Sequence, residues 1–327
     1  MTKIVVTGPV PEPALAALRA SGADPMIGAG DTIPVDELHD LVAGADAVLT
    51  LLTARVDDAF LDAAGPQLRI VANVAVGYNN VDVAACATRG VVVTNTPGVL
   101  TDATADIALA LVLMATRRLG EGERVIRSGQ AWQWGMLFHL GTGIQGRRLG
   151  IVGMGQIGQA LARRASACGM TIAYSNRTRL DPATEAMLGA TYVTLDQLFA
   201  TSDVVSLHCP YSPATHHLVD AARLATMKPS AFLINTARGP IVDEAALVAA
   251  LCAGTIAGAG LDVFEHEPTV HPGLLALENV VLVPHVGSAT RETRTAMATL
   301  AAHNALAVLA GDPALTPVAG SPVVAGT

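Results

Sequence analysis

Three residues that could do chemistry together, Arg238, Glu267 and His285, each lie a few residues beyond a short apolar run typical of a buried strand. An Arg guanidinium grips a carboxylate with two parallel hydrogen bonds, and a His can donate a proton near neutral pH. A carboxylate beside that His stabilises the imidazolium and orients its ring. Since ligands bind at the carboxyl ends of strands in open α/β sheets, we expect the three residues to converge on a small 2-oxo acid.

A second feature is a glycine loop that contains Gly153, Gly155 and Gly158. It follows the apolar run 149–152 and opens a helix-patterned stretch, 157–168. In this order the first glycine allows a tight turn, the second lets the backbone approach phosphate, and the third lets the helix pack on the strand. The pattern predicts a pyrophosphate site for a dinucleotide.

The turn about 20 residues beyond this loop bears on which dinucleotide binds. An NAD enzyme usually has Asp or Glu there to hold the ribose 2′-hydroxyl. This chain instead has Ser175, Asn176, Arg177, Thr178 and Arg179. A hydroxyl, an amide and a guanidinium suit a 2′-phosphate, which a carboxylate would repel. We therefore expect NADP(H) to be preferred, with NAD(H) used at lower efficiency.

The elements that position these residues alternate between strand and helix patterns, which predicts an α/β protein with parallel sheets. The length of 327 residues suits two domains. Two doubly wound units are predicted, one on each side of a long apolar helix that begins near Thr101. The predicted strands are 4–6, 47–50, 68–74 and 91–93 in the first unit, and 149–152, 171–174, 191–193, 204–207, 231–235, 258–263 and 280–283 in the second.

Other segments have plainer interpretations. The segment 120–147, which holds both tryptophans, is expected to be an extended excursion that contacts another subunit or domain. His216 and His217 lie in a polar stretch and are expected to be solvated. After a last helix, 291–309, the Pro/Gly-rich tail from Gly311 is expected to pack poorly.

Composition narrows the class of protein. Hydrophobic residues make up 51% and charged residues 15%, which provides material for buried cores. The net charge of −8 and the scattered arginines argue against nucleic acid or a membrane surface as a partner. No apolar run reaches the ~20 residues of a membrane span. The four cysteines are far apart, which predicts no metal site and a cytoplasmic location.

Several motifs together resemble those of the D-isomer-specific 2-hydroxyacid dehydrogenases, over nearly the whole chain. They are the run 73–82, the glycine loop, the segment 208–210, the segment 235–239, Glu267 with Pro268, and the segment 284–288. The resemblance implies that Arg238, Glu267 and His285 are catalytic, and that Val76 and Gly77 bind substrate together with Arg238 and His285. It also implies a Rossmann cofactor domain, 99–287, inserted in a split flavodoxin-like substrate domain, 1–98 and 288–327.

The same resemblance implies a set of cofactor contacts at strand ends and helix starts. These are Thr104, Gly153, Gly155, Gln156, Ile157, Gly158, Ser175, Asn176, Arg177, Thr178, Cys209, Pro210, Thr215, Thr236, Ala237, Asp262, His285 and Gly287.

Within the family, the turn 175–178 and the run 77–80 look most like NADP-dependent glyoxylate/hydroxypyruvate reductases. That likeness implies reduction of glyoxylate and hydroxypyruvate with His285 as the acid, and a homodimer with a dimerisation arm at about 120–147. Phe138 lies roughly where related reductases carry Trp. Two alternatives remain open: a reductase of larger 2-oxo acids such as 2-ketogluconate, and a catalytically weak, nucleotide-sensing corepressor-like protein.

Overall fold

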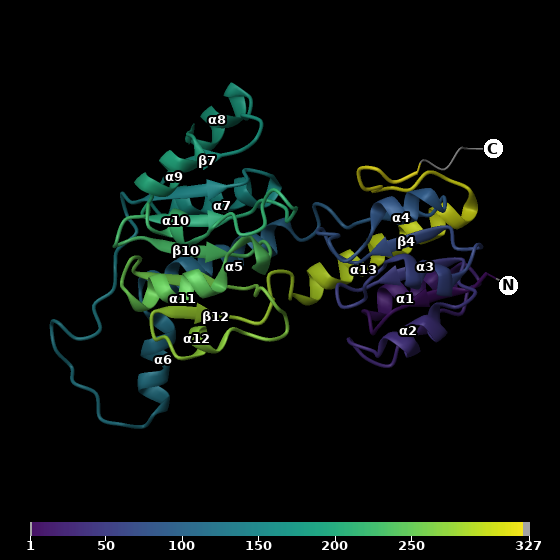
Figure 1. Cartoon of the computed structure of the whole chain (residues 1–327), viewed down its shortest axis with the longest axis horizontal. Helices are drawn as coiled ribbons and strands as arrows, with labels where there is room; N and C mark the ends of the chain where they lie inside the picture. Colours follow the sequence, from purple (N-terminus) through teal and green to yellow (C-terminus); the bar gives the residue numbers. More distant parts are fainter. Residues whose placement is uncertain (1, 323–327) are drawn as a thin grey trace. The chain divides into compact units, whose positions relative to one another are not determined.

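The computed structural model describes residues 2–322, and within them the chain divides into two compact units. The first unit is formed by both ends of the chain, Met1–Leu100 and Ala289–Thr327. The second is the continuous stretch Thr101–Ser288. In Figure 1 the first unit carries the purple, blue and yellow ends of the colour bar, and the second carries the teal and green middle.

The sheet of the first unit is parallel throughout and has the strand order β2-β1-β3-β4-β5. This order, 2-1-3-4-5, is that of flavodoxin-like folds. The central strands are buried on both faces, so they are continuous apolar runs rather than alternating ones. The strands are β1 (Ile4–Val6), β2 (Met26–Ile27), β3 (Ala47–Thr50), β4 (Ile70–Asn73) and β5 (Val92–Thr94).

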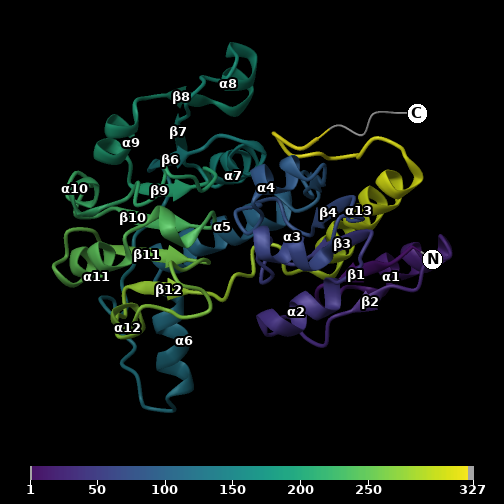
Figure 2. The same ribbon diagram turned by 45° about the vertical axis from the view of Figure 1, so that its right-hand side comes forward.

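Helices cover both faces of this sheet. One face packs on α1 and on α13, which crosses β3 and β4 (Figure 2) and presents Ala298, Ala301 and Ala305 to the sheet. The opposite face packs on α2, α3 and α4 through residues such as Phe60. The helices are α1 (Glu12–Ala20), α2 (Val35–Val42), α3 (Asp58–Ala64), α4 (Val83–Thr88) and α13 (Arg291–Ala310).

The segment after α13 is packed, so the expectation of a loose tail from Gly311 is wrong for residues 311–322. Thr316 accepts a hydrogen bond from the Asn304 side chain at 2.9 Å and donates to the Asn95 carbonyl at 2.6 Å. Val318 is buried beside β5. These partners are distant in sequence, so the proline and glycine content of the tail could not predict the contacts. Residues 323–327 lie outside the described chain.

The sheet of the second unit is also parallel, with the order β12-β11-β10-β9-β6-β7-β8. The order reverses between β6 and β9, as in a Rossmann fold, and that reversal creates a ligand-binding crevice at the carboxyl ends. The strands are β6 (Arg148–Val152), β7 (Thr171–Ser175), β8 (Ala190–Tyr192), β9 (Val204–Leu207), β10 (Phe232–Asn235), β11 (Gly258–Leu261) and β12 (Val280–Leu282).

Two helical layers enclose this second sheet. α5 and α7 bury one apolar cluster around Leu111 and Leu161, and α9 to α11 bury another around Phe199 and Leu247. The helices are α5 (Thr101–Thr116), α7 (Gln156–Ala167), α8 (Pro182–Leu188), α9 (Leu195–Thr201), α10 (Ala221–Leu224), α11 (Glu244–Cys252) and α12 (Pro272–Leu275), with a 3-10 turn, η1, at Gly239–Ile241.

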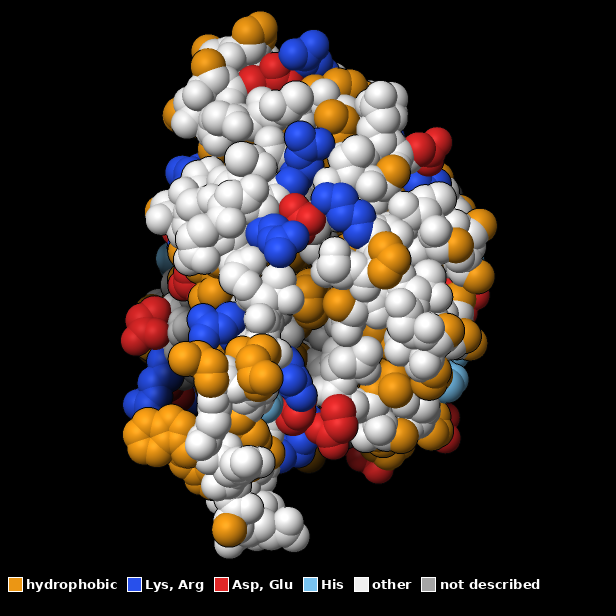
Figure 3. Space-filling model, turned by 90° about the vertical axis from the view of Figure 1, so that its left-hand side faces the viewer, with side chains coloured by type: hydrophobic (Ala, Val, Ile, Leu, Met, Phe, Trp, Pro, Cys, Tyr) orange, Lys and Arg blue, Asp and Glu red, His pale blue; other side chains and the backbone are white. Residues whose placement is uncertain are grey.

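The excursion between α5 and β6 contains one helix, α6 (Leu119–Arg127), that the sequence did not lead us to expect. No residue of α6 is buried within the described chain. The stretch that follows projects from the unit, and Figure 3 shows hydrophobic side chains gathered on it at the bottom of the view. Trp134 and Met136 are about nine-tenths exposed, at 91% and 92%.

Across residues 2–322, none of the helices combines the length and the apolar character that crossing a bilayer requires.

Candidate active site

Arg238 lies in a tight loop that leaves the carboxyl end of β10. The Asn235 side chain holds this loop, because its amide donates to the Arg238 carbonyl at 2.9 Å and its oxygen accepts from the Ala237 N–H at 3.0 Å. The guanidinium donates to the Ala237 carbonyl at 2.7 Å. Burial lowers the pKa of Arg238, and the nearby charge of Glu267 opposes that shift. A cation in this setting is ready to bind an anion.

Glu267 and His285 form a hydrogen-bonded pair at the ends of two neighbouring strands, β11 and β12. The Oε2 atom of Glu267 lies 2.8 Å from Nδ1 of His285, and Oε1 accepts the Phe264 N–H at 2.9 Å. Burial acts to raise the pKa of Glu267, but the hydrogen bond and charge of His285, with help from Arg238, hold it below its usual value. A carboxylate bound to Nδ1 leaves Nε2 of His285 available for a substrate.

The side chain and the carbonyl of Asp262 hold the backbone around His285. The carboxylate of Asp262 accepts the N–H groups of Val286 and Gly287 at 2.6 and 2.8 Å, and its carbonyl accepts the His285 N–H. His285 itself has a φ of 49°, which is uncommon for a residue other than glycine. Burial raises the pKa of Asp262 although both N–H groups oppose the shift. Asp262 thus holds the turn that presents the imidazole.

The glycine loop has the geometry that a dinucleotide pyrophosphate needs. Gly153 has a φ of 96°, and an added Cβ would lie 2.5 Å from the Cys209 N atom, so the loop crosses the end of β9 closely. A Cβ on Gly158 would lie 2.5 Å from the Gly153 carbonyl oxygen. A Cβ added to Gly155, in contrast, would meet no atom within 4 Å among the described residues other than its chain neighbours, and no side chain in residues 2–322 caps α7. The helix N-terminus is therefore open to an anion.

A second polar group that suits a cofactor is the side chain of Thr236, one residue beyond β10. Its hydroxyl is buried and has no hydrogen-bond partner among the described residues. Buried hydroxyls normally have a partner, and at this strand end a bound molecule could supply one. Together with the open start of α7, this fits a nicotinamide dinucleotide lying across the strand ends.

The two arginines in the turn after β7 differ in their contacts. The Arg179 guanidinium forms two hydrogen bonds of 2.8 Å to Glu185, which also accepts the Tyr174 hydroxyl. These bonds hold the pKa of Glu185 at about 2. The Asn176 side chain accepts the Met154 N–H at 2.6 Å and so ties the turn to the glycine loop. Arg177 is exposed and forms no side-chain hydrogen bond or ion pair within residues 2–322.

Most of the other predicted cofactor residues line the same strand ends. Thr104 and Asp262 both lie beside Gly287, since a Cβ there would be 3.0 Å from Asp262 and 3.4 Å from Thr104. Thr215 folds its own loop by donating to the Pro210 carbonyl at 2.9 Å. Burial lowers the pKa of His208 to about 4 and raises that of Cys209 to about 11, so both are neutral near pH 7.

Val76 and Gly77 belong to the first unit, where two asparagines hold their carbonyls. The Asn95 side chain donates to the Val76 carbonyl at 2.8 Å, and the Asn73 side chain donates to the Gly77 carbonyl at 3.0 Å. With its carbonyls engaged, this turn has a defined orientation for its N–H groups.

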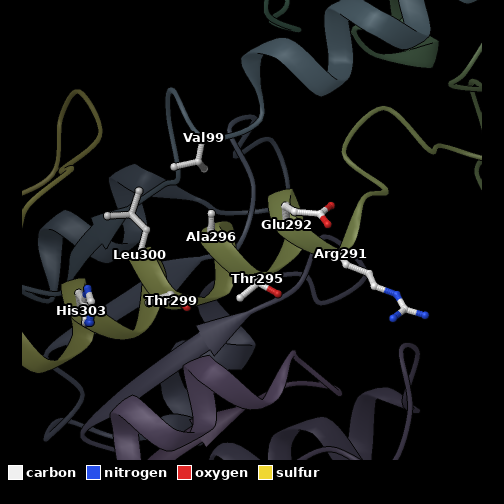
Figure 4. A pocket seen from close by; sticks show the side chains of 8 residues that line it. All are labelled: Val99, Arg291, Glu292, Thr295, Ala296, Thr299, Leu300 and His303. Carbon is white, nitrogen blue, oxygen red and sulfur yellow. The ribbon is translucent and has the colours of Figure 1, made fainter.

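A hollow of about 620 Å³ on α13 of the first unit is a separate feature (Figure 4). Ala296 and Leu300 point from α13 towards Val99, which comes from a different segment, whereas Arg291 points away. None of the predicted site residues, all of which lie in the described chain, lines this hollow. The hollow is therefore distinct from the candidate active site.

His217 corrects an expectation, because it is not simply solvated. Its Nε2 lies 2.5 Å from the Glu265 carboxylate, 48 residues away in sequence. Glu265 and its partner Glu244 were not among the predicted site residues. The one sequence feature that could have pointed to Glu265 is its position two residues before Glu267.

Comparison with known proteins decides the family. The profile of the D-isomer specific 2-hydroxyacid dehydrogenase family, NAD binding domain, matches residues 109–287, which is more than half of the chain. The chain belongs to this family. Among similar members, a glyoxylate reductase from Thermococcus litoralis is 51% identical over 274 residues, which is 82% of each chain.

Solved structures of the family agree with the fold. A protein from Thermus thermophilus superposes with a TM-score of 0.91 at 44% identity, covering 97% of this chain and 100% of that one. An NADPH-dependent glyoxylate/hydroxypyruvate reductase from Sinorhizobium meliloti, solved with NADP and malonate, has a TM-score of 0.84 at 39% identity over 98% of both chains. The two-sheet α/β fold predicted from the sequence is confirmed, and this D-2-hydroxyacid dehydrogenase family member is an oxidoreductase.

Proposed function

We propose that the protein reduces short 2-oxo acids, glyoxylate and hydroxypyruvate, to 2-hydroxy acids with NADPH. The observation that carries this proposal is the Glu267–His285 pair near the half-buried Arg238, at the strand ends of a dinucleotide-binding unit. The glyoxylate reductases among its relatives support the substrate class.

Each of the three residues has a separate role in the proposed reaction. Arg238 binds the substrate carboxylate through two parallel N–H donors, with backbone N–H groups of Val76 and Gly77 as further donors. His285 donates its Nε2 proton to the carbonyl oxygen, whose negative charge develops as the carbon is reduced. Glu267, ionised because its pKa is lowered, stabilises the imidazolium before that transfer.

The cofactor supplies the hydride when it is bound. Gln156 and Ile157, at the open start of α7, would hold its pyrophosphate, and Thr104, Thr236 and Asp262 would lie at the nicotinamide. Ser175 and Arg177 would hold a 2′-phosphate, whereas Arg179 is engaged with Glu185. The absence of a carboxylate at residues 175–179, and a neighbour solved with NADP, support NADPH over NADH.

Steady-state kinetics test the proposal directly. The purified protein is assayed with glyoxylate, hydroxypyruvate and 2-ketogluconate, each with NADPH and with NADH, by loss of absorbance of the reduced cofactor. We expect the highest kcat/KM for a two- or three-carbon acid with NADPH. Preference for 2-ketogluconate would favour a reductase of larger acids. Absence of turnover with every acid would favour a nucleotide-sensing protein.

We also propose that the protein is a homodimer whose dimerisation arm is the excursion at about 120–147. There the Trp132 ring stacks on Phe138 and lies at a tilt to Trp134. Met136 and Leu137 are more than four-fifths exposed. A contiguous apolar surface of this kind marks a protein contact. Light scattering should give a dimer for the native chain and a monomer for Trp134→Ser with Met136→Ser. A monomeric native chain contradicts the proposal.

A cytoplasmic location is the remaining part of this proposal. All four cysteines are free thiols in the structure. Thiols persist in reducing compartments, which supports the cytoplasm.

A further inference from the structure

The strongest feature outside the catalytic triple is a group of ionisable residues behind it, Glu265, Glu244 and His217. Glu265 follows β11 and is two residues from Glu267, but its carboxylate contacts different partners. Oε1 lies 2.5 Å from Nε2 of His217, and Oε2 accepts the Glu244 N–H at 3.3 Å. The Glu244 carboxylate in turn accepts the Glu265 N–H at 2.8 Å. Glu265 is therefore bound through both its backbone and its side chain.

These contacts join three separate segments of the second unit. Glu244 is the first residue of α11, which follows the Arg238 loop through η1. His217 lies in the loop after β9, and its N–H donates to the Pro240 carbonyl at 2.9 Å. Gly239 packs so closely on the Glu265 segment that an added Cβ would collide with the Phe264 carbonyl group. The turn 264–267 is thus held against the segment 239–244 from several sides.

Fixing this turn fixes the orientation of Glu267. The Phe264 N–H engages Oε1 of Glu267, so the position of the Phe264 backbone decides where Oε2 meets His285. Arg238 depends less on Glu265, because Asn235 holds its loop independently. A disturbance at Glu265 should therefore act on the Glu267–His285 pair before it acts on the Arg238 guanidinium.

The ionisable residues of this group suit a role in holding the turn 264–267 in place. Two carboxylates, Glu244 and Glu265, lie side by side, and Glu244 is 4% exposed. Burial and the charge of Glu265 raise the pKa of Glu244, while His266 and His271 act in the opposite direction. Burying like charges costs stability unless they are paired or hydrogen-bonded. Here Glu265 lies against His217, and each of the two carboxylates accepts a backbone N–H from the other residue.

We propose that Glu265, held by His217 and Glu244, is a positioning residue that sets the Glu267–His285 geometry for proton donation. This inference rests on the proposed function, since it assumes that His285 is the acid. The other ionisable groups whose charges interact with the Glu267–His285 pair are Arg238 and Asp262. Glu265 touches neither substrate nor cofactor in this proposal, and it acts only through the turn 264–267.

The test compares Glu265→Ala and Glu265→Gln with a matched control, Asp203→Ala. Asp203 is a carboxylate with 16% side-chain exposure, against 15% for Glu265. Like Glu265, it accepts a backbone N–H, from Arg148 at 2.8 Å, and pairs with a cation, Lys228. It precedes β9 and lies at the opposite, amino-terminal end of the sheet, so its loss should lower stability without touching the catalytic pair.

The full pH profile of kcat and KM is measured for each variant by NADPH oxidation. Glu265→Ala should lower kcat on the order of tenfold, since small misplacements of catalytic groups cost that much or more. It should leave KM for the 2-oxo acid within about twofold and move the basic limb of the profile to lower pH, the direction also expected for Glu267→Gln. Glu265→Gln, which keeps an oxygen for the Glu244 N–H, should recover most of kcat.

Specific results overturn the inference. An unmoved basic limb in Glu265→Ala, or an equal movement in Asp203→Ala, would show that Glu265 is merely structural. If Glu265→Ala does not fold, His217→Ala gives the same decision, because it should move the limb in the same direction. If Glu267→Gln leaves the limb unmoved, the proposed acid role of the pair fails and this inference fails with it.

Discussion

The two sheets of this protein are both parallel and doubly wound, yet the helices that follow their first central strands differ at the N-terminus. In the first unit, α1 follows β1 and begins with Pro11 at its cap, Glu12 in its first turn and a further proline at Pro13. In the second unit, α7 follows β6 and begins with Gly155, and its first turn has no acidic residue. Topology therefore provides a comparable place in both sheets.

The chemistry of the first turn decides what that place can bind. Prolines remove N–H donors, and a glutamate adds a negative charge where the helix dipole would otherwise attract an anion. At α7 the N–H groups remain and a Cβ-free glycine leaves space for phosphate. The same doubly wound topology is therefore present in both units, and a few residues at the start of one helix make it suitable for a cofactor.

The largest effects should come from residues at the strand ends of the second unit. His285→Ala and Arg238→Ala should each lower kcat/KM by at least ~10²-fold, because each loses a proton donor or a clamp on the developing charge. In the first unit, Asn95→Ala, which frees the Val76 carbonyl, should raise KM with kcat nearly unchanged. Near-native turnover in either of the first two variants would refute their assignment.

A tenfold effect is expected at the Glu267–His285 pair. The pKa of Glu267 is lowered, so its carboxylate is present at neutral pH and is lost only as pH falls through that depressed value. Glu267→Gln removes the charge at every pH, and the basic limb of the rate profile should move down by about one unit, worth about tenfold in rate above it. A limb that moves upward would contradict the role of Glu267.

Cofactor choice should change by about tenfold in Arg177→Ala. One charge-assisted hydrogen bond contributes roughly 1.5–3 kcal/mol, and the loss should fall on NADPH and spare NADH. The ratio of kcat/KM for the two cofactors measures this. Arg179→Ala is the comparison, since Arg179 is bound to Glu185 and its loss should affect thermal stability more than the ratio. The reverse order of effects would reassign the phosphate contact to Arg179.

The smallest effect tests the comparison of helix starts itself. Gln156→Glu gives α7 an acidic first turn like that of α1, and should weaken NADPH binding a few-fold, on the order of 1 kcal/mol. Glu12→Gln makes the opposite change in α1 and should leave cofactor binding unaltered. Titration of NADPH by fluorescence measures both. Equal affinity in native protein and Gln156→Glu would mean that charge at this helix start is unimportant.

Local sequence patterns were enough to predict the alternation of strands and helices, the glycine loop and the polar residues at strand ends. These are local features: a tight turn needs glycine at Gly153, and a buried strand needs an apolar run such as 149–152. The family motifs then placed Arg238, Glu267 and His285 in one constellation, and the structure pairs Glu267 with His285.

Tertiary structure alone decided the contacts between distant segments. It brought His217 to Glu265, 48 residues away, and Thr316 to Asn95, 221 residues away. A charged or polar side chain has many suitable partners along a chain, and its own sequence position does not select among them. That selection comes from how the strands order themselves in each sheet, which brings residues tens of positions apart to the same edge.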